Sequence, residues 1–518
     1  MAGRAEPVNP KPGIGAAICV VALILACLGS VFWRAEAGRG LSAYDWAAVR
    51  FTLMQAVLSA AFSVALAIPV ARALARRQFF GRQALIILLG APFILPVIVA
   101  VLGLLQVFGR AGWFSIALGW FGLPPVQIYG LHGVVLAHVF FNLPLATRLI
   151  LQGWQDIPAE RFRLAAQLGA GPVAMWRLLE KPMLTRLVPG VLAVVFAICL
   201  TSFAVALTLG GGPKATTIEL AIYQAFRFDF DLGRAAMLSV VQILLTGSAA
   251  LIAFKVSRGD GFGRGLDRPM QRWDAHTLGA KGLDAVIIGL ASLFLVLPLA
   301  AIVLSGLPRL LSLPSVVYTS AITSILVALG STCVLLALAI PMALAAATRR
   351  YSWVEMIGLL GLATSPLVIG TGLFLMINPI LDPFLLALPV TALVNAILAL
   401  PFALRILVPG AREEVARFGR LGLALNMQGW QFLRHVVLPR MRPQIGFAAG
   451  LTAALSMGDL GVIVLFADPE RATLPLQIFR LMGSFQMQAA AGAALLLLML
   501  SLGIFWVLDR GGRRHVEN

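Results

Sequence analysis

The sequence has few charged residues: Asp, Glu, Lys and Arg make up 12% of its 518 residues, whereas a soluble domain carries about 25%. Hydrophobic residues make up 60%, and the mean hydropathy is +0.93, which excludes an ordinary soluble enzyme. Apolar runs of about 20 residues recur along the chain, the length at which a helix crosses a bilayer core. They do not alternate with polar residues as the strands of a membrane β-barrel do. The composition therefore predicts an all-α polytopic membrane protein embedded in a lipid bilayer.

Acidic residues are scarcer than basic ones, with 22 Asp and Glu against 40 Lys and Arg and a formal charge of +18. In a soluble protein such an excess would indicate nucleic-acid binding. In a membrane protein it is explained by basic residues that gather in the cytoplasmic loops. With the N-terminus inside, about three quarters of the Lys and Arg residues fall in loops on that side. We therefore expect both termini in the cytoplasm and no nucleic-acid partner.

Cysteine and histidine are also rare, with four and five residues. All four cysteines fall in hydrophobic runs without CxxC spacing, so we interpret them as small buried apolar residues. His132 and His138 lie six positions apart and do not share a helix face. The chain has no GxxxxGK[ST] phosphate loop either. The sequence thus predicts no metal site and no nucleotide site on this chain.

Twelve apolar segments are long enough to cross a bilayer, six in each half of the chain. In the first half we expect helices over 14–33, 51–71, 84–108, 129–147, 188–210 and 236–256. In the second half we expect helices over 283–305, 317–346, 354–376, 384–404, 446–466 and 486–508. The polar, glycine-rich stretch 257–281 between them is typical of a flexible linker. The sequence predicts two permease-like halves, 1–256 and 282–518, joined by a cytoplasmic linker.

A polar loop occurs at the same place in each half, over 148–186 and over 405–443. One offset of 257 relates the two copies, and it pairs Pro144 with Pro401, Arg148 with Arg405, Arg163 with Arg420 and Pro182 with Pro439. Such a fixed register implies two parallel repeats. Each loop ends in a short amphipathic stretch, 171–179 or 428–437. One copy alone would fit a helix lying on the lipid interface, but two copies in register favour two equivalent sites that dock in a groove of a partner.

The two loops resemble the signature loop of ABC importer permeases, which reads E-A-A-x-x-x-G with a proline thirteen residues after the glycine. Arg163 and Arg420 stand where the family has Glu, and Asn426 stands where it has Gly. Asparagine still tolerates the left-handed conformation that the turn needs. The candidate ATPase-coupling residues are Arg163, Leu164, Ala165, Gly169, Met175, Trp176 and Pro182 in the first loop, and Arg420, Leu421, Gly422, Asn426, Trp430, Phe432 and Pro439 in the second.

This resemblance implies the fold of type I ABC importer permeases, also called MetI-like. It also implies that two copies of a separate ATPase subunit bind the loops. ATP and Mg would then be held by that partner, with no cofactor and no catalytic residue on this chain.

Further segments are similar to the permeases of thiamine ABC transporters: 109–113, 129–152, 163–169 and 209–224, with 456–468 and 471–476 in the second half. Those permeases also have fused halves. The resemblance implies import of thiamine and its phosphate esters across a bacterial inner membrane, with delivery by a periplasmic thiamine-binding protein. Charged residues of the outer loops could dock that protein or could simply be solvated: Lys214, Glu219, Arg227, Asp229, Asp231 and Arg471.

Asp459 is the one ionisable residue that we expect deep inside a membrane helix, where charge is costly and usually functional. The 257 offset pairs it with Ser202. We expect Asp459, Ser202, Thr201 and Ser456 to line a translocation path, where a carboxylate would favour a cationic substrate. The alternative is that Asp459 hydrogen-bonds within the helix bundle or marks a helix end.

Two other functions stay open at this point. A fused permease of a ferric-iron ABC importer would share the two-half layout and the loops. An ion-coupled secondary transporter would need several intramembrane carboxylates or His pairs, and the sequence offers only Asp459.

Overall fold

The computed structural model describes residues 8–35, 40–90, 94–256, 277–348, 351–358, 360–466 and 472–513. Throughout these residues the chain forms helices and no β-strand. Ten helical segments of this described part are long and apolar enough to cross a membrane. The prediction of an all-α polytopic membrane protein is therefore confirmed.

The helices follow one another in similar order in the two halves of the sequence. Those of the first half are α1 Lys11–Arg34, α2 Ala43–Arg76, α3 Arg82–Leu88, α4 Val97–Phe108, α5 Trp113–Gly119, α6 Leu131–Gln155, α7 Ala159–Gln167, α8 Pro172–Met175, η2 Trp176–Glu180, α9 Lys181–Leu200, α10 Phe203–Leu209, η3 Pro213–Ala215, α11 Ile218–Arg227 and α12 Leu232–Val256. Those of the second half are α13 Leu278–Gly306, η5 Leu307–Ser312, α14 Ser315–Ala347, α15 Trp353–Gly358, α16 Leu360–Ala363, α17 Pro366–Ile377, η7 Pro383–Leu386, α18 Ala387–Ala424, α19 Trp430–Phe432, η8 Leu433–Val437, α20 Leu438–Arg440, α21 Arg442–Met457, α22 Gly461–Phe466, α23 Leu474–Gly483 and α24 Met487–Arg513.

Four of the twelve predicted membrane segments are divided into shorter helices: 84–108, 188–210, 354–376 and 446–466. In two of them a new helix starts at or just after a proline, Pro96 before α4 and Pro366 in α17. Proline cannot donate to the helical ladder, and it disfavours the helical conformation in the residue before it. The other two breaks follow Leu200 and Met457. Helices thus form in all twelve predicted segments, but within the described residues two segments, 354–376 and 446–466, contain no helix long enough to span a membrane. Apolar character did not show where the backbone leaves the helix.

The predicted linker ends earlier than expected. Helix α13 begins at Leu278, inside 257–281, because the hydroxyl of Thr277 accepts a hydrogen bond from the backbone N–H of Ala280 at 3.3 Å and caps the helix. Residues 257–276 lie outside the described residues.

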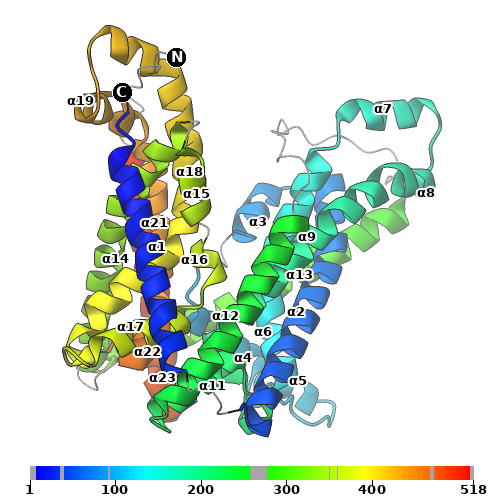
Figure 1. The fold of residues 1–518 in the computed structure, drawn as a ribbon. Coiled ribbons are helices and arrows are strands. Elements are labelled where there is room, and N and C mark those ends of the chain that lie inside the picture. Colours follow the sequence, from blue (N-terminus) through cyan, green and yellow to red (C-terminus); the bar gives the residue numbers. More distant parts are fainter. Residues whose placement is uncertain are drawn as a thin grey trace.

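The first helix of each half packs against the other half. Helix α1 lies along α14 and α17, and α13 lies along α4 and α2 (Figure 1). These contacts are close: a Cβ at Gly13 would come within 2.1 Å of the carbonyl oxygen of Pro341, and one at Gly103 within 2.4 Å of that of Pro298. Small residues let membrane helices approach in this way. The two halves of the sequence are therefore interlocked.

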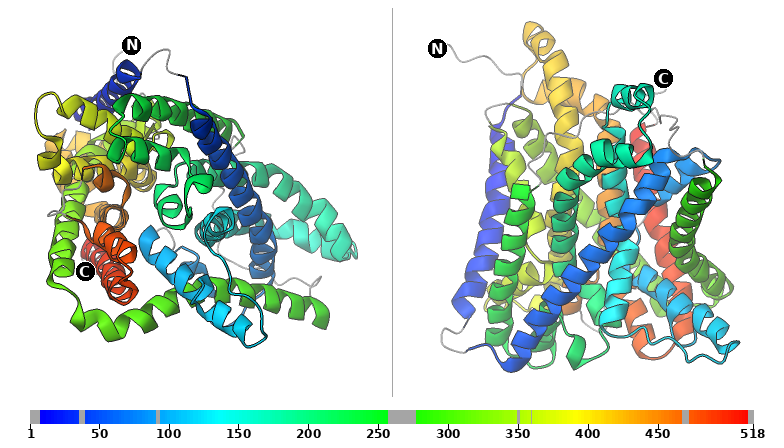
Figure 2. Two further views of the ribbon diagram at one scale, coloured as in Figure 1. Left: turned by 90° about the horizontal axis from the view of Figure 1, so that it is seen from below. Right: turned by 90° about the vertical axis from the view of Figure 1, so that its right-hand side faces the viewer.

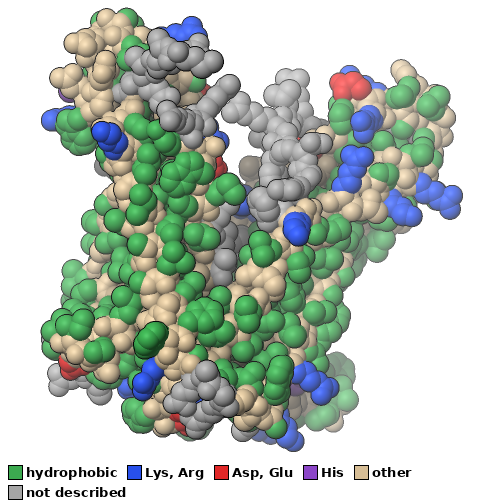
Figure 3. Space-filling model, in the orientation of Figure 1, with side chains coloured by type: hydrophobic (Ala, Val, Ile, Leu, Met, Phe, Trp, Pro, Cys, Tyr) green, Lys and Arg blue, Asp and Glu red, His purple; other side chains and the backbone are tan. Residues whose placement is uncertain are grey.

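Both predicted loops lie at the same end of the molecule. Helices α7 and α8 occupy the end of one lobe, and α19 occupies the end of the other (Figure 1). Helices α5, α11 and α23 lie at the opposite end, which we call the outer end, and the second view of Figure 2 shows the long helices running between the two ends. Apolar side chains cover much of the surface between the ends, as expected of a lipid-facing surface (Figure 3).

Candidate functional site

Each predicted loop turns through a left-handed residue at the expected position. Gly169 has φ = 66° and Asn426 has φ = 55°. The backbone N–H of Ala170 donates to the carbonyl of Ala165 at 2.9 Å, and that of Met427 donates to Gly422 at 2.8 Å. These bonds have the six-to-one spacing of the Schellman motif, which ends a helix with a left-handed residue. The left-handed turn predicted for both copies is confirmed, with Asn426 in place of the glycine.

A π-helical turn follows in each loop, and the two turns are again 257 positions apart: η2 over Trp176–Glu180 and η8 over Leu433–Val437. Pro182 and Pro439 each come two residues after the turn. In a regular α-helix a proline ring clashes with the carbonyl four residues earlier, and a wider turn relieves this clash. Single π turns of this kind occur often at functional sites.

Met175 and Phe432 occupy equivalent positions, but the structure contradicts their predicted role in docking to a partner. Their side chains are only 1% and 0% exposed. The Phe432 ring lies against Gly422, where an added Cβ would come within 2.6 Å of the ring. The amphipathic stretch therefore turns these side chains inward, and they hold the loop in shape.

The side chains that do face outward form a repeated apolar patch, which we call the docking trio of each loop. Its members are between 55% and 76% exposed and are related by the 257 offset. The trios are Leu164, Leu168 and Val173 in the first loop, and Leu421, Leu425 and Trp430 in the second. Arg163 and Arg420 are exposed beside them. Leu168, Leu425 and Val173 were missed from the sequence, although the offset alone would have paired them.

Trp176 does not project toward a partner either. It is partly buried, and the guanidinium carbon of Arg72 on α2 lies 4.9 Å from its ring centroid. Arg72 also forms an ion pair with the fully buried Glu180, at 2.7 Å, and Arg76 approaches the same carboxylate at 3.7 Å. These three charged residues were not singled out from the sequence, because α2 and the loop are about 100 residues apart.

At the helix break after α9, polar side chains form a short series of hydrogen bonds. Thr201 ends α9, and Ser202 has an extended backbone before α10 begins. The imidazole of His138 on α6 lies between two hydroxyls, with Nε2 2.7 Å from Ser202 and Nδ1 3.1 Å from Ser59 on α2. Thr201 bonds only back to the carbonyl of Ile198, at 3.2 Å, within the described hydrogen bonds.

The equivalent break after α21 contains Asp459. Ser456 accepts a hydrogen bond from Asn395 at 3.0 Å and pairs with Ser331 at 2.9 Å. The 257 offset maps Asn395 onto His138, so the two breaks are supported in the same way from α6 and α18. Asp459 marks a helix end, as one of the two sequence readings required: its Oδ1 accepts from the N–H of Gly461 at 3.2 Å.

The second oxygen of Asp459 is buried and accepts no hydrogen bond from the residues that the structure describes. This break also lies where the two halves meet, because a Cβ at Gly458 would come within 2.9 Å of Pro96 from the first half. A carboxylate oxygen without a partner at such a place is a candidate ligand group.

Glu219 is a further buried carboxylate, and its prediction as a charged group of an outer loop is wrong. The residue was expected in an outer loop, but it is fully buried in α11 and accepts a hydrogen bond from Gln242 at 2.9 Å. It therefore cannot dock a partner at the surface.

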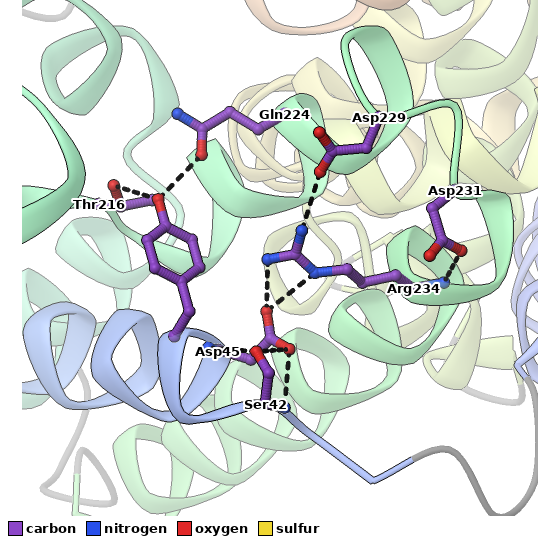
Figure 4. A network of polar contacts seen from close by, with 8 residues as sticks. Ser42, Asp45, Thr216, Gln224, Asp229, Asp231 and Arg234 are labelled. Atoms are coloured by element: carbon purple, nitrogen blue, oxygen red, sulfur yellow. Dashed lines mark hydrogen bonds and ion pairs between the residues drawn. The ribbon is translucent and has the colours of Figure 1, made fainter.

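A cavity of about 770 Å³ lies at the outer end between the α1–α2 and α11–α12 connections. Arg234 points toward Asp45 and Asp229 there, with distances of 2.8 Å and 2.9 Å (Figure 4). The hydroxyl of Tyr44 donates a hydrogen bond to Gln224 at 3.4 Å. A smaller cavity of about 460 Å³ is formed by the corresponding connections of the second half, with Arg309 and Phe485 in its wall. Arg471 lies outside the described residues. The outer end thus has one cavity in each half, and the cavity of the first half contains more carboxylates.

The fold and the two repeated loops define the class of the protein, a polytopic permease of the ABC importer type. No family model matches the chain. It is 39% identical to the thiamine transport system permease protein of Escherichia coli strain K12, with all of both chains covered. It is 38% identical to that of Brucella abortus strain 2308, over 96% of this chain and 93% of the relative. It is 32% identical to that of Haemophilus influenzae Rd, over 92% and 90%. The chain belongs to the family of thiamine transport system permeases.

Proposed function

We propose that this chain is the permease subunit of an ABC importer that carries thiamine across the bacterial inner membrane. Two copies of a separate ATPase subunit would bind the docking trios, and a periplasmic thiamine-binding protein would deliver the substrate at the outer end. Under this proposal both termini and both loops are cytoplasmic. The chain is no enzyme by itself, since ATP and Mg are held by the ATPase.

The observation that carries the proposal is the pair of loops at one end of the molecule. Each presents the same exposed apolar trio, beside the same exposed arginine, on the same left-handed turn. Exposed apolar patches rimmed by polar residues mark protein interfaces. Two copies of one patch require two copies of one partner surface, which fits a pair of identical ATPase subunits.

The outer end supports contact with a binding protein. The two cavities lie in corresponding connections, so a partner with two lobes can reach one cavity with each lobe. Asp45, Asp229 and Arg234 in the larger cavity leave an excess of negative charge, whereas Arg309 makes the smaller one positive. Complementary charges across an interface fix the register of docking.

For the substrate, the proposal rests on the relatives and on Asp459. Thiamine is a cation, and one oxygen of Asp459, at the junction of the halves, accepts no hydrogen bond from the described residues and offers a carboxylate for it. Ser202, Thr201 and Ser456 lie at the two helix breaks near the same level of the repeat. Discontinuous helices at the junction of two repeats are a common setting for substrate sites in transporters.

The test is uptake of radiolabelled thiamine into proteoliposomes that contain the permease, the ATPase and the binding protein. We expect uptake that requires ATP and all three proteins. Unlabelled thiamine, thiamine pyrophosphate and ferric iron are added as competitors. Uptake of labelled ferric iron in place of thiamine would assign the chain to iron import, and uptake driven by an ion gradient without ATPase would contradict the ABC mechanism.

A further inference from the structure

We propose that Glu180 positions the first ATPase-docking loop by clamping it to α2, so that this loop follows the movement of α2, whereas the equivalent positions of the second half, Val437 and Leu344, are apolar. The inference rests on the proposed function, since it concerns how the loop transmits force to an ATPase.

The clamp holds both ends of the π turn. Glu180 is the last residue of η2, and its Oε2 accepts from Nε and Nη2 of Arg72 at 2.8 Å and 2.7 Å. Trp176 is the first residue of η2, and its ring lies beneath the same guanidinium, 4.9 Å from the guanidinium carbon. A single α2 side chain therefore fixes the segment that joins the docking trio to α9. Charge-assisted and cation–π contacts of this kind have defined directions, so they set a position.

In the second loop the equivalent position is apolar, and the charged contact lies elsewhere: Arg440, three residues after the turn, pairs with Glu414 of α18 at 3.6 Å and stacks on Phe418. The residue equivalent to Glu180 is Val437, which is buried, and the 272-residue register that pairs Ser59 with Ser331 places Leu344 of α14 where α2 has Arg72. Buried ion pairs are often no more stabilising than apolar residues of similar size. We therefore assign the clamp a role in position and direction, beyond stability.

The two loops also differ in how each is joined to the membrane helix that precedes it. Helix α18 continues without interruption from the membrane segment to Ala424. In the first loop, α6 ends at Gln155 and α7 starts only after Pro158. The first docking trio is thus joined to α6 through a break, and its connections to the membrane part are the continuous helical run α8–η2–α9 and the clamp of that run to α2.

Helix α2 connects the clamp with the other two polar sites. It carries Asp45, paired with Arg234 at the outer end, and Ser59, bonded to His138 beside the helix break. The helix from Asp45 to Arg72 is about 40 Å long at 1.5 Å per residue. One continuous helix with polar contacts at three levels, and with Pro69 inside it, can carry a displacement from the outer cavity to the first loop.

The experiment replaces the clamp with the residues of the second half, in the double variant Arg72→Leu/Glu180→Val. Thiamine uptake and ATP hydrolysis are measured together in proteoliposomes of the full complex. We expect ATP hydrolysis to continue while thiamine molecules carried per ATP fall about tenfold. The charge-swapped variant Arg72→Glu/Glu180→Arg should recover a large part of the ratio. The matched control is Glu355→Gln, which breaks the exposed Arg412–Glu355 pair of the second half and should leave the ratio unchanged.

A second readout does not depend on the cargo. In the purified permease, amide hydrogen exchange over 170–181 should rise at least tenfold in the single variant Arg72→Leu, which removes the main partner of the buried Glu180, and remain unchanged over 427–438. A wild-type complex that fails to import thiamine would contradict the proposed function, while this exchange comparison would still judge the clamp. A wild-type transport ratio in the double variant, or unaltered exchange over 170–181, would overturn the proposal.

Discussion

Replacing Gly422 by Ala should loosen the second loop, and a second change at Phe432 should restore it. The added methyl group would lie 2.6 Å and 2.8 Å from two carbons of the Phe432 ring, whereas non-bonded carbons prefer about 3.5–4.0 Å. The ring must move by about 1 Å in a fully buried site. Overpacking of this kind costs about 1–3 kcal/mol.

The first loop supplies the compensating change. Its equivalent residues are Ala165 and Met175, and Met175 is as well buried as Phe432. Phe432→Met alone removes ring contacts and should cost about 1 kcal/mol. The double variant Gly422→Ala/Phe432→Met recreates the Ala–Met pair, so it should be less destabilised than the sum of the single variants by about 1–2 kcal/mol.

Amide hydrogen exchange of the purified permease measures the free energy of local opening directly. A loss of about 2 kcal/mol speeds exchange over 427–438 about 30-fold, since 1.4 kcal/mol is a factor of ten. Exchange over 170–181 is the internal control, because the first loop is unchanged. Strictly additive effects, or a Gly422→Ala variant that exchanges like the wild type, would refute the inward packing of Phe432.

Three other substitutions test the parts of the two sites. Trp430→Ala should weaken binding of the ATPase about tenfold in a titration of purified subunits, without changing hydrogen exchange in the loop, because the Trp430 side chain is exposed. An equal loss of binding in Trp506→Ala, at an exposed membrane-helix position, would show that the effect is not local. Asn426→Gly should be nearly neutral, whereas Asn426→Val should cost about 1–2 kcal/mol of loop stability by the same exchange measurement, because Asn426 has φ = 55°. A neutral Asn426→Val variant would contradict the left-handed turn. Asp459→Asn should lower thiamine uptake severalfold while ATPase binding is retained, and unchanged uptake at equal protein amount would remove the carboxylate from the path.

The 257-residue offset made the loops predictable from the sequence. It located both prolines and the pairing of Ser202 with Asp459, because a repeated register does not depend on knowing any contact. The two left-handed turns were predicted from the resemblance to the signature loop of ABC importer permeases. The same offset links the two π turns and the two docking trios. Apolar length also located the membrane segments, since a bilayer of fixed thickness sets that length.

The direction of the side chains was not predictable in the same way. An amphipathic pattern in a short stretch shows that one face is apolar, but it does not tell whether that face meets the chain itself or a partner. Phe432 packs on Gly422, ten residues away across the turn, and Glu180 pairs with Arg72 across 108 residues. Glu219 was placed in an outer loop because it falls between the predicted membrane segments 188–210 and 236–256, whereas the turn at the start of α11 buries it against Gln242.

The most direct test of the central claim is photo-crosslinking from both loops in the assembled complex. A photoreactive amino acid is placed at Leu168 or Leu425, the exposed equivalents, and at Met175 or Phe432 as buried controls. The account predicts that Leu168 and Leu425 each crosslink to the ATPase in comparable yield, whereas the buried positions crosslink within the permease. Crosslinks from only one loop, or from neither, would contradict the conclusion that the repeated loops are two equivalent ATPase-docking sites.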